Sequence, residues 1–140
     1  MPLLRSQSAN RMESNKSRDV IDHRVVTAGA ILGGLAVVLG ALGVHALQSR
    51  IGADALGWWH TAVEYQMWHA LAVVALGLSG CRWAWASAWL FVGGSVVFSG
   101  TLCAVALGAP HWLGAITPLG GLAMILGWIV LAVRAARFRP

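Results

Sequence analysis

The chain has 140 residues, of which 58% are hydrophobic and only 11% are charged, and its formal net charge is +5. A soluble domain of this length could not bury so much apolar surface, so the composition is that of a membrane protein. No base-reading motif accompanies the positive charge, which excludes nucleic acid as a partner.

The N-terminal segment, residues 1–22, is polar and contains the stretch SQSANRMESNKSRD. It holds too little apolar surface to build a core. We therefore expect a disordered cytoplasmic tail, followed by one transmembrane domain over residues 25–136.

The first apolar segment, residues 25–47, exceeds the roughly 20 residues that a helix needs to cross a bilayer core. It is also longer than the roughly 7 to 15 residue core of a signal peptide, so we interpret it as a transmembrane helix. Small residues recur along it at spacings of four and three, which keeps them on one face that another helix can approach closely. They are Gly29, Gly33, Ala36, Gly40 and Gly43.

The second segment, residues 60–78, begins with HTAVEYQMWHA, which is unusually polar for a helix in lipid. At 100° per residue, His60, Glu64 and His69 fall within one broad face. Gln66 falls outside that face. Because an ionised glutamate facing lipid costs at least a few kcal/mol, we expect the face that carries Glu64 to point into the bundle.

The third segment, residues 83–107, and the fourth, residues 112–133, are also long and apolar enough to span a bilayer. Both repeat the small-residue pattern, with Ala86, Gly93, Gly100 and Ala104 in the third segment and Gly120, Ala123 and Gly127 in the fourth. Tight contact along such seams is the main force that joins helices in lipid. The seams either hold the four helices together, which we favour, or form a homo-oligomer.

The start of the fourth helix is marked by Pro118. Proline has no N–H to donate to the carbonyl of Gly114. The helix therefore either begins at Thr117 or is kinked there.

The basic residues predict the topology. Nine of the ten fall on one side of the four segments, and only Arg50 lies in a loop on the other side. By the positive-inside rule, both termini are cytoplasmic. We predict an all-α integral membrane protein, an antiparallel bundle of four transmembrane helices joined by short loops.

Polar side chains from all four helices form the candidate functional site. Counted along the helices, most of them lie at a similar depth in the outer half of the bilayer, and His69 lies lower, near the midplane. The predicted polar layer consists of His45, Glu64, Tyr65, His69, Thr101 and Thr117.

Three functions fit this layer. The favoured one is structural: the side chains make interhelical hydrogen bonds, each worth about 1 kcal/mol, in a non-enzymatic structural or accessory membrane component. The second is an ion, proton or solute carrier, in which Glu64 exchanges protons with His45 or His69. The third is a metal-binding or haem-binding protein, in which His45, His60, His111 and Glu64 converge.

Known chemical motifs are missing from the sequence. There is no HExxH or Cys/His cluster, so we predict no cofactor and no metal. There is likewise no Gly-x-Ser-x-Gly elbow, phosphate loop or pair of spaced carboxylates. The sequence therefore favours a non-enzymatic protein, and we predict no catalytic residue.

Four stretches carry a family resemblance: LGALGVHAL, WHTAVEYQMWHALAVVALG, FSGTLCAVALG and LGAITPLGGLAMILGWIVLA. In this order they resemble the YgdD/YwdK-like family of small bacterial inner-membrane proteins, over about residues 25–133. The resemblance implies a multi-pass protein of the bacterial cytoplasmic membrane, with the lipid bilayer as its partner. The family has no assigned activity, so the resemblance implies no catalytic or ligand-binding residue.

Overall fold

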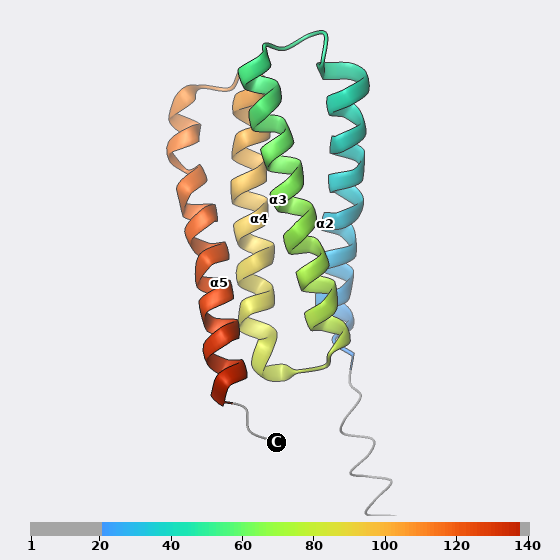
Figure 1. Cartoon of the computed structure of the whole chain (residues 1–140), viewed down its shortest axis with the longest axis vertical. Helices are drawn as coiled ribbons and strands as arrows, with labels where there is room; N and C mark the ends of the chain where they lie inside the picture. The colour runs from blue at the N-terminus through green and yellow to red at the C-terminus, as the bar shows by residue number, and fades with distance from the viewer. Residues whose placement is uncertain (1–20, 138–140) are drawn as a thin grey trace, which may run out of the picture.

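The computed structural model of the protein describes residues 21–137, which form four long helices that run alternately up and down (Figure 1). They are α2 (His23–Leu42), α3 (Ala53–Leu78), α4 (Trp85–Ala106) and α5 (Thr117–Arg137). No strand occurs among the described residues. The predicted all-α fold with four antiparallel helices is confirmed. The predicted tail lies outside the described residues, except for Ile21 and Asp22.

Short helical turns extend three of these helices. A π-helical turn, η1 (Gly43–Leu47), continues α2, and two 3₁₀ turns, η2 (Arg82–Ala84) and η3 (His111–Ala115), precede α4 and α5. With these turns, three stretches are apolar and long enough to cross a membrane: His23–Leu47, Arg82–Ala106 and His111–Arg137.

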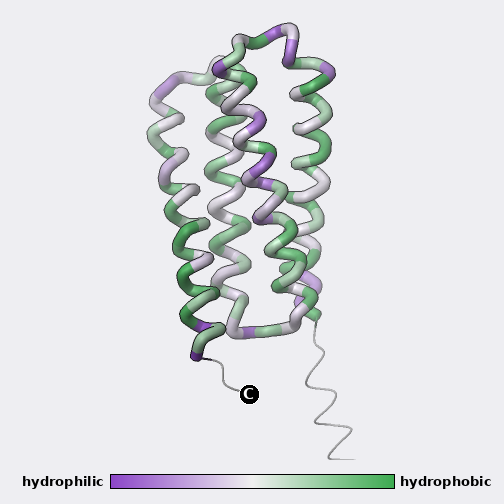
Figure 2. The backbone as a smooth tube through the Cα atoms, viewed as in Figure 1, coloured by the Kyte–Doolittle hydropathy of each residue, from purple (hydrophilic) through white to green (hydrophobic). Residues whose placement is uncertain are grey.

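Helix α3 is not among those three, although its 26 residues rise by about 39 Å, which exceeds a hydrocarbon core. Figure 2 shows the cause, because hydrophilic positions follow this helix from its upper end to about its middle. The helix begins at Ala53, seven residues before the predicted start, and Asp54 in its first turn complements the helix dipole. Glu64 therefore lies near the middle of α3 and not one turn from its end.

Helix starts follow local capping rules. The side-chain oxygen Oδ1 of Asp22 accepts hydrogen bonds from the backbone N–H groups of Arg24 and Val25, which caps α2. Of the two alternatives for the fourth helix, the structure has the first: α5 begins at Thr117, after the 3₁₀ turn, with Pro118 in its first turn.

The helices pack in chain order, so that α3 and α4 each lie between two neighbours, while α2 and α5 do not pack against each other (Figure 1). Glycines allow the closest contacts. A Cβ on Gly29 would lie 2.8 Å from a methyl carbon of Val74, and one on Gly120 would lie 2.5 Å from the backbone nitrogen of Phe98. Helices α2 and α3, and helices α4 and α5, thus meet almost backbone to backbone.

The predicted glycine seams differ in their use. Gly43 lies against the Trp59 ring, and Gly127 lies against the Phe91 ring. Gly33 and Gly40 have α3 side chains at ordinary van der Waals distance. On α4, however, the expected Gly93 and Gly100 are exposed, and a Cβ added at either would meet no atom within 4 Å, whereas Gly94 packs against α5.

Candidate functional site

Two buried polar side chains join neighbouring helices through backbone carbonyls. The Gln66 side-chain amide donates to the carbonyl of Leu32 at 2.9 Å, linking α3 to α2. The Ser99 hydroxyl donates to the carbonyl of Ala62 at 2.8 Å, linking α4 to α3. Both residues are at least 95% buried. In lipid such bonds resist sliding of one helix along another, because a displaced side chain leaves its polar group unpaired.

Helices α4 and α5 are joined by two threonines of the predicted layer. The hydroxyl groups of Thr101 and Thr117 lie 2.8 Å apart. The Thr101 hydroxyl also lies within hydrogen-bond distance of the carbonyls of Val97 and Phe98, which holds its rotamer. Among the described residues, these two threonines are the members of the predicted layer whose side chains hydrogen-bond directly to each other.

His69 is buried among aromatic rings and has a partner at each ring nitrogen. Its Nδ1 lies 2.8 Å from the carbonyl oxygen of Tyr65, and its Nε2 accepts a hydrogen bond from the Trp128 indole N–H at 3.2 Å. Because a carbonyl only accepts, the proton is assigned to Nδ1 and the ring is neutral. The Phe91 ring lies 5.2 Å from the imidazole, centre to centre. This environment supplies no counter-charge for an imidazolium ion.

Glu64 does not point into the bundle. Glu64, His60 and His45 are all exposed, whereas Gln66 is buried. The expected orientation of α3 is therefore wrong for Glu64. The physical reason is steric: the face with Ala62, Gln66 and Ala70 is narrow enough for both neighbouring helices to approach closely.

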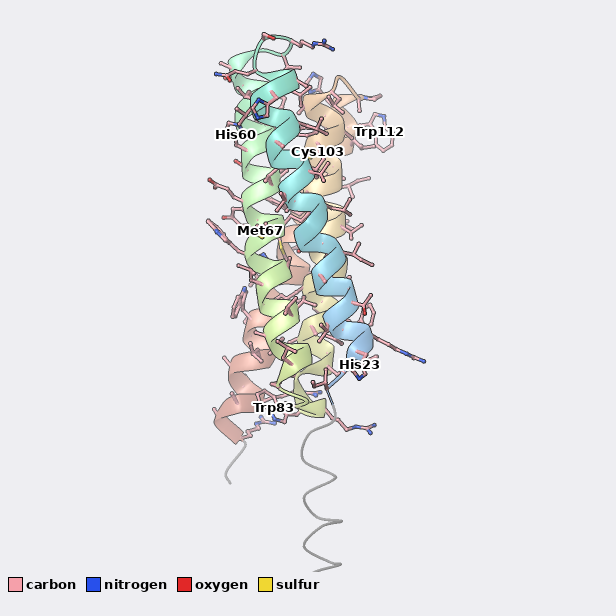
Figure 3. The ribbon with its side chains drawn as sticks, turned by 90° about the vertical axis from the view of Figure 1, so that its right-hand side faces the viewer. His23, His60, Met67, Trp83, Cys103 and Trp112 are labelled. Carbon is pink, nitrogen blue, oxygen red and sulfur yellow. The ribbon has the colours of Figure 1, made fainter. Side chains whose placement is uncertain are left out.

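The predicted layer is also not at one depth. Ser99 contacts Ala62, and α3 and α4 are antiparallel, so the Thr101 hydroxyl lies about level with His60, one turn or roughly 5 to 6 Å from Glu64. Tyr65 is 38% exposed, and its ring packs on Phe98 at 5.1 Å. Figure 3 shows His60 near the same end of the molecule as Trp112, far from His23 and Trp83.

Sequence reasoning missed several of the interhelical contacts. The indole N–H of Trp59 donates to the carbonyl of Leu39 at 2.8 Å, although this tryptophan resembles an interfacial anchor in the sequence. The buried face of α4 follows a four-residue period that the sequence analysis did not use. Its members are Ser87, Phe91, Ser95 and Ser99. That period was the available signal for the inner face of the helix.

No three side chains of His, Cys, Asp or Glu gather closely enough to hold a metal ion within residues 21–137. His45 is exposed in η1, His60 and Glu64 are exposed on α3, and His111 lies in the turn before α5. The donor set proposed for a metal or haem site is therefore not assembled in this part of the chain.

Known sequences identify the family. The family described as "Protein of unknown function (DUF423)" matches residues 39–121. The chain is 43% identical over 118 residues to UPF0382 membrane protein YwdK of Bacillus subtilis, covering 81% of this chain and 96% of that protein. It is 37% identical over 115 residues to UPF0382 inner membrane protein YgdD of Escherichia coli, covering 79% and 87%.

A third relative, UPF0382 membrane protein SERP0230 of Staphylococcus epidermidis, is 38% identical over 117 residues, covering 81% of this chain and 95% of that protein. No solved structure matches the chain. The relatives carry the names of membrane proteins, and three of the described helices are long and apolar enough to span a bilayer. The chain therefore belongs to the DUF423 family and is an integral protein of the cytoplasmic membrane.

Proposed function

We propose that the protein is a non-enzymatic structural or accessory component of the membrane, in which polar side chains between the helices hold the helices in register. One observation carries the proposal. Of the six buried polar residues among those described, five form a hydrogen bond to another helix, and Ser87 is the exception. The five are Gln66, His69, Ser95, Ser99 and Thr117. Polar groups used in this way hold the fold and leave little to line a path for ions.

The alternative of an ion, proton or solute carrier has less support. Glu64 and His45 are exposed on α3 and on the π-helical turn that continues α2, and His69 is buried with both ring nitrogens occupied. A proton added at Nε2 of His69 would face the Trp128 N–H, which is itself a donor. A relay through these three residues would therefore have to break a contact between α3 and α5 first.

We infer that the protein also associates with a second copy of itself through the outer face of α3. Glu64 is exposed near the middle of this helix, where contact with lipid costs at least a few kcal/mol. His60 lies one turn away on the same exposed face and can donate to a carboxylate. In a two-fold dimer, His60 of one copy can reach Glu64 of the other, and the reverse pair forms by symmetry.

Native mass spectrometry and flux assays test both parts. In proteoliposomes we expect no proton or cation flux above that of empty vesicles. If the protein carries a flux and Glu64→Gln abolishes it, the carrier function is correct and the structural function is wrong.

For self-association we expect a dimer by native mass spectrometry, and we expect Glu64→Leu and His60→Leu each to dissociate it. Gly93→Leu, on the exposed glycine seam of α4 (Gly93 and Gly100), is the matched control and should keep the dimer. If only Gly93→Leu dissociates the dimer, the contact lies on that seam of α4 instead.

A further inference from the structure

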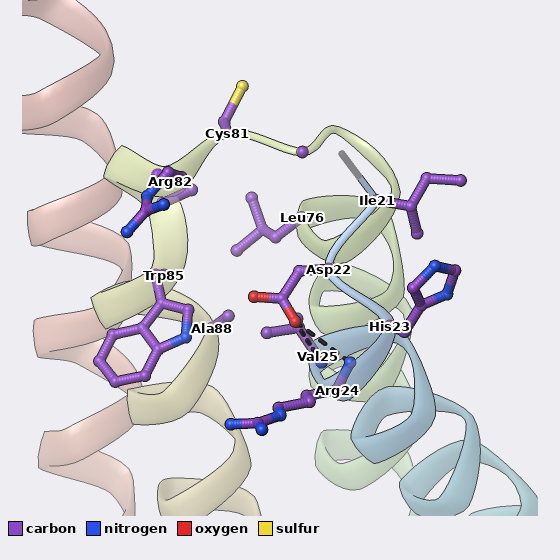
Figure 4. A pocket seen from close by; sticks show the side chains of 12 residues that line it. Ile21, Asp22, His23, Arg24, Val25, Leu76, Cys81, Arg82, Trp85 and Ala88 are labelled. Atoms are coloured by element: carbon purple, nitrogen blue, oxygen red, sulfur yellow. Dashed lines mark hydrogen bonds between the residues drawn. The ribbon is translucent and has the colours of Figure 1, made fainter. Parts of the chain in front are cut away.

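A cavity of about 1000 Å³ opens between the start of α2 and the start of α4 (Figure 4). Apolar side chains line its inner part: Val25 and Leu76 from α2 and α3, and Ala84 and Ala88 from η2 and α4. Val25, Ala84 and Ala88 are almost fully buried. The cavity therefore continues the interior surface of the bundle, at the end where the described chain begins and ends.

The rim of this cavity is basic. Arg24 and Arg82 both line it, and in Figure 4 both side chains extend to the side that holds the Trp85 ring, whereas Cys81 and His23 point away. Both arginines are exposed, and within residues 21–137 neither guanidinium group has a hydrogen-bond or ion-pair partner. A guanidinium group presents a fork of N–H donors that matches the oxygens of a phosphate.

One acidic group also lines the cavity. The Asp22 carboxylate caps α2, and its Oδ1 is occupied by two backbone N–H groups. Two guanidinium groups and one carboxylate leave one net positive charge at the rim. That charge matches a ligand with a single negative charge.

The Trp85 ring lies at the edge of the cavity and faces outward. It is 56% exposed, and its ring centre lies 6.1 Å from that of Trp89 in an edge-on arrangement. Tryptophan prefers the headgroup level of a bilayer. Basic groups at that level beside an apolar groove are typical of contacts with anionic lipids.

We propose that this cavity binds the phosphate headgroup of an anionic phospholipid with one negative charge. The guanidinium groups of Arg24 and Arg82 donate to the phosphate oxygens, the Trp85 ring lies at the headgroup, and one acyl chain lies against Leu76, above the buried Val25 and Ala88. This site is independent of the self-association proposed for the outer face of α3, because neither His60 nor Glu64 lines the cavity.

Native mass spectrometry of protein released from nanodiscs tests the site. With equal amounts of phosphatidylglycerol and phosphatidylcholine of the same acyl chains, wild type should retain mainly the anionic lipid. Arg24→Gln with Arg82→Gln should reduce the retained fraction roughly tenfold, because charge-assisted hydrogen bonds are lost. Both side chains are exposed, so the thermal unfolding temperature should not change.

Two matched controls localise the effect. Arg137→Gln removes a charge at the same end of the bundle but outside the cavity, and Arg50→Gln removes one at the opposite end. Both should retain the anionic lipid as wild type does. Equal retention of the two lipids by wild type, or an equal loss in Arg137→Gln, would overturn the proposal.

The two arginines could also bind a soluble phosphate in place of a lipid phosphate group. Millimolar inorganic phosphate should not displace the lipid from wild type, because it makes no contact with the apolar walls. Displacement together with a phosphate adduct on lipid-free protein would assign the site to a soluble phosphate and overturn the lipid assignment.

Discussion

The indole N–H of Trp128 donates a hydrogen bond to Nε2 of His69 at 3.2 Å, and this bond joins α5 to α3 beside the ring of Phe91. The imidazole is thereby held as the neutral Nδ1–H tautomer. Helices α3 and α5 both pack on α4. The pair therefore acts as a tie between two helices that otherwise have little contact.

Removing the indole N–H should weaken that tie. Trp128→Phe keeps an aromatic ring near Phe91 but deletes the donor, and we expect it to lower the free energy of unfolding by about 1 kcal/mol. His69→Phe should cost a similar amount, and the double variant should cost less than the sum. Unfolding in mixed micelles, followed by circular dichroism, measures all three.

Trp89→Phe is the matched control, because Trp89 is exposed and its indole N–H has no partner among the described residues. It should leave stability within a few tenths of a kcal/mol. Fully additive effects of Trp128→Phe and His69→Phe would contradict the hydrogen bond as a tie.

The two polar residues Gln66 and Glu64 should respond in opposite ways to leucine. Gln66→Leu removes a buried donor to the Leu32 carbonyl and should destabilise the monomer by about 1 kcal/mol. Glu64→Leu removes an ionisable group from the outer surface and should leave monomer stability unchanged or raised. The measurement is the unfolding free energy at a detergent dilution where both variants are monomeric. Destabilisation by Glu64→Leu alone would mean that α3 is turned the other way.

The sequence was sufficient for the number of helices and insufficient for their rotation. Continuous apolar runs predict helices of membrane length, and Pro118 restricts the start of α5 to two alternatives. Which face turns inward is harder to infer, because lipid and protein interior are equally apolar and hydrophobicity does not separate them. Charge suggested Glu64 as the inner residue, whereas small side chains at Ala62 and Ala70 set the close contact.

The same ambiguity explains the error on α4. Gly93 and Gly94 are adjacent, and a difference of one residue turns a helical position by 100°. The regular spacing of Gly93 and Gly100 indicated a seam, but the buried face follows Ser87, Phe91 and Ser95. The serines on that face are about as small as the glycines and alanines on the other, so side-chain size alone did not separate the two faces.

Alanine at these adjacent glycines should therefore separate the two faces. A Cβ on Gly94 would lie 2.7 Å from Met124 Cγ and 2.9 Å from the carbonyl oxygen of Gly120, so Gly94→Ala should destabilise by roughly 1 to 3 kcal/mol. A Cβ on Gly93 meets nothing within 4 Å. Gly93→Ala should be neutral or stabilising by up to about 1 kcal/mol, because alanine is the better helix former. Thermal unfolding in one detergent compares them directly, and equal effects would contradict the packing of α4 on α5.

The predicted cytoplasmic termini can be tested with the free thiols. Cys81 lies in the loop between α3 and α4, near Arg24 and Arg82 (Figure 4) and at the end where Arg134 bonds to the Trp83 carbonyl, and Cys103 lies within α4. With both termini cytoplasmic, Cys81 in a Cys103→Ser variant should react with a membrane-impermeant maleimide only after spheroplasts are permeabilised. Ser49→Cys, placed in a variant without Cys81 and Cys103, lies in the opposite loop beside Arg50 and should react in intact spheroplasts. The reverse labelling pattern would mean that the termini face outward, and that the positive-inside rule fails for this chain.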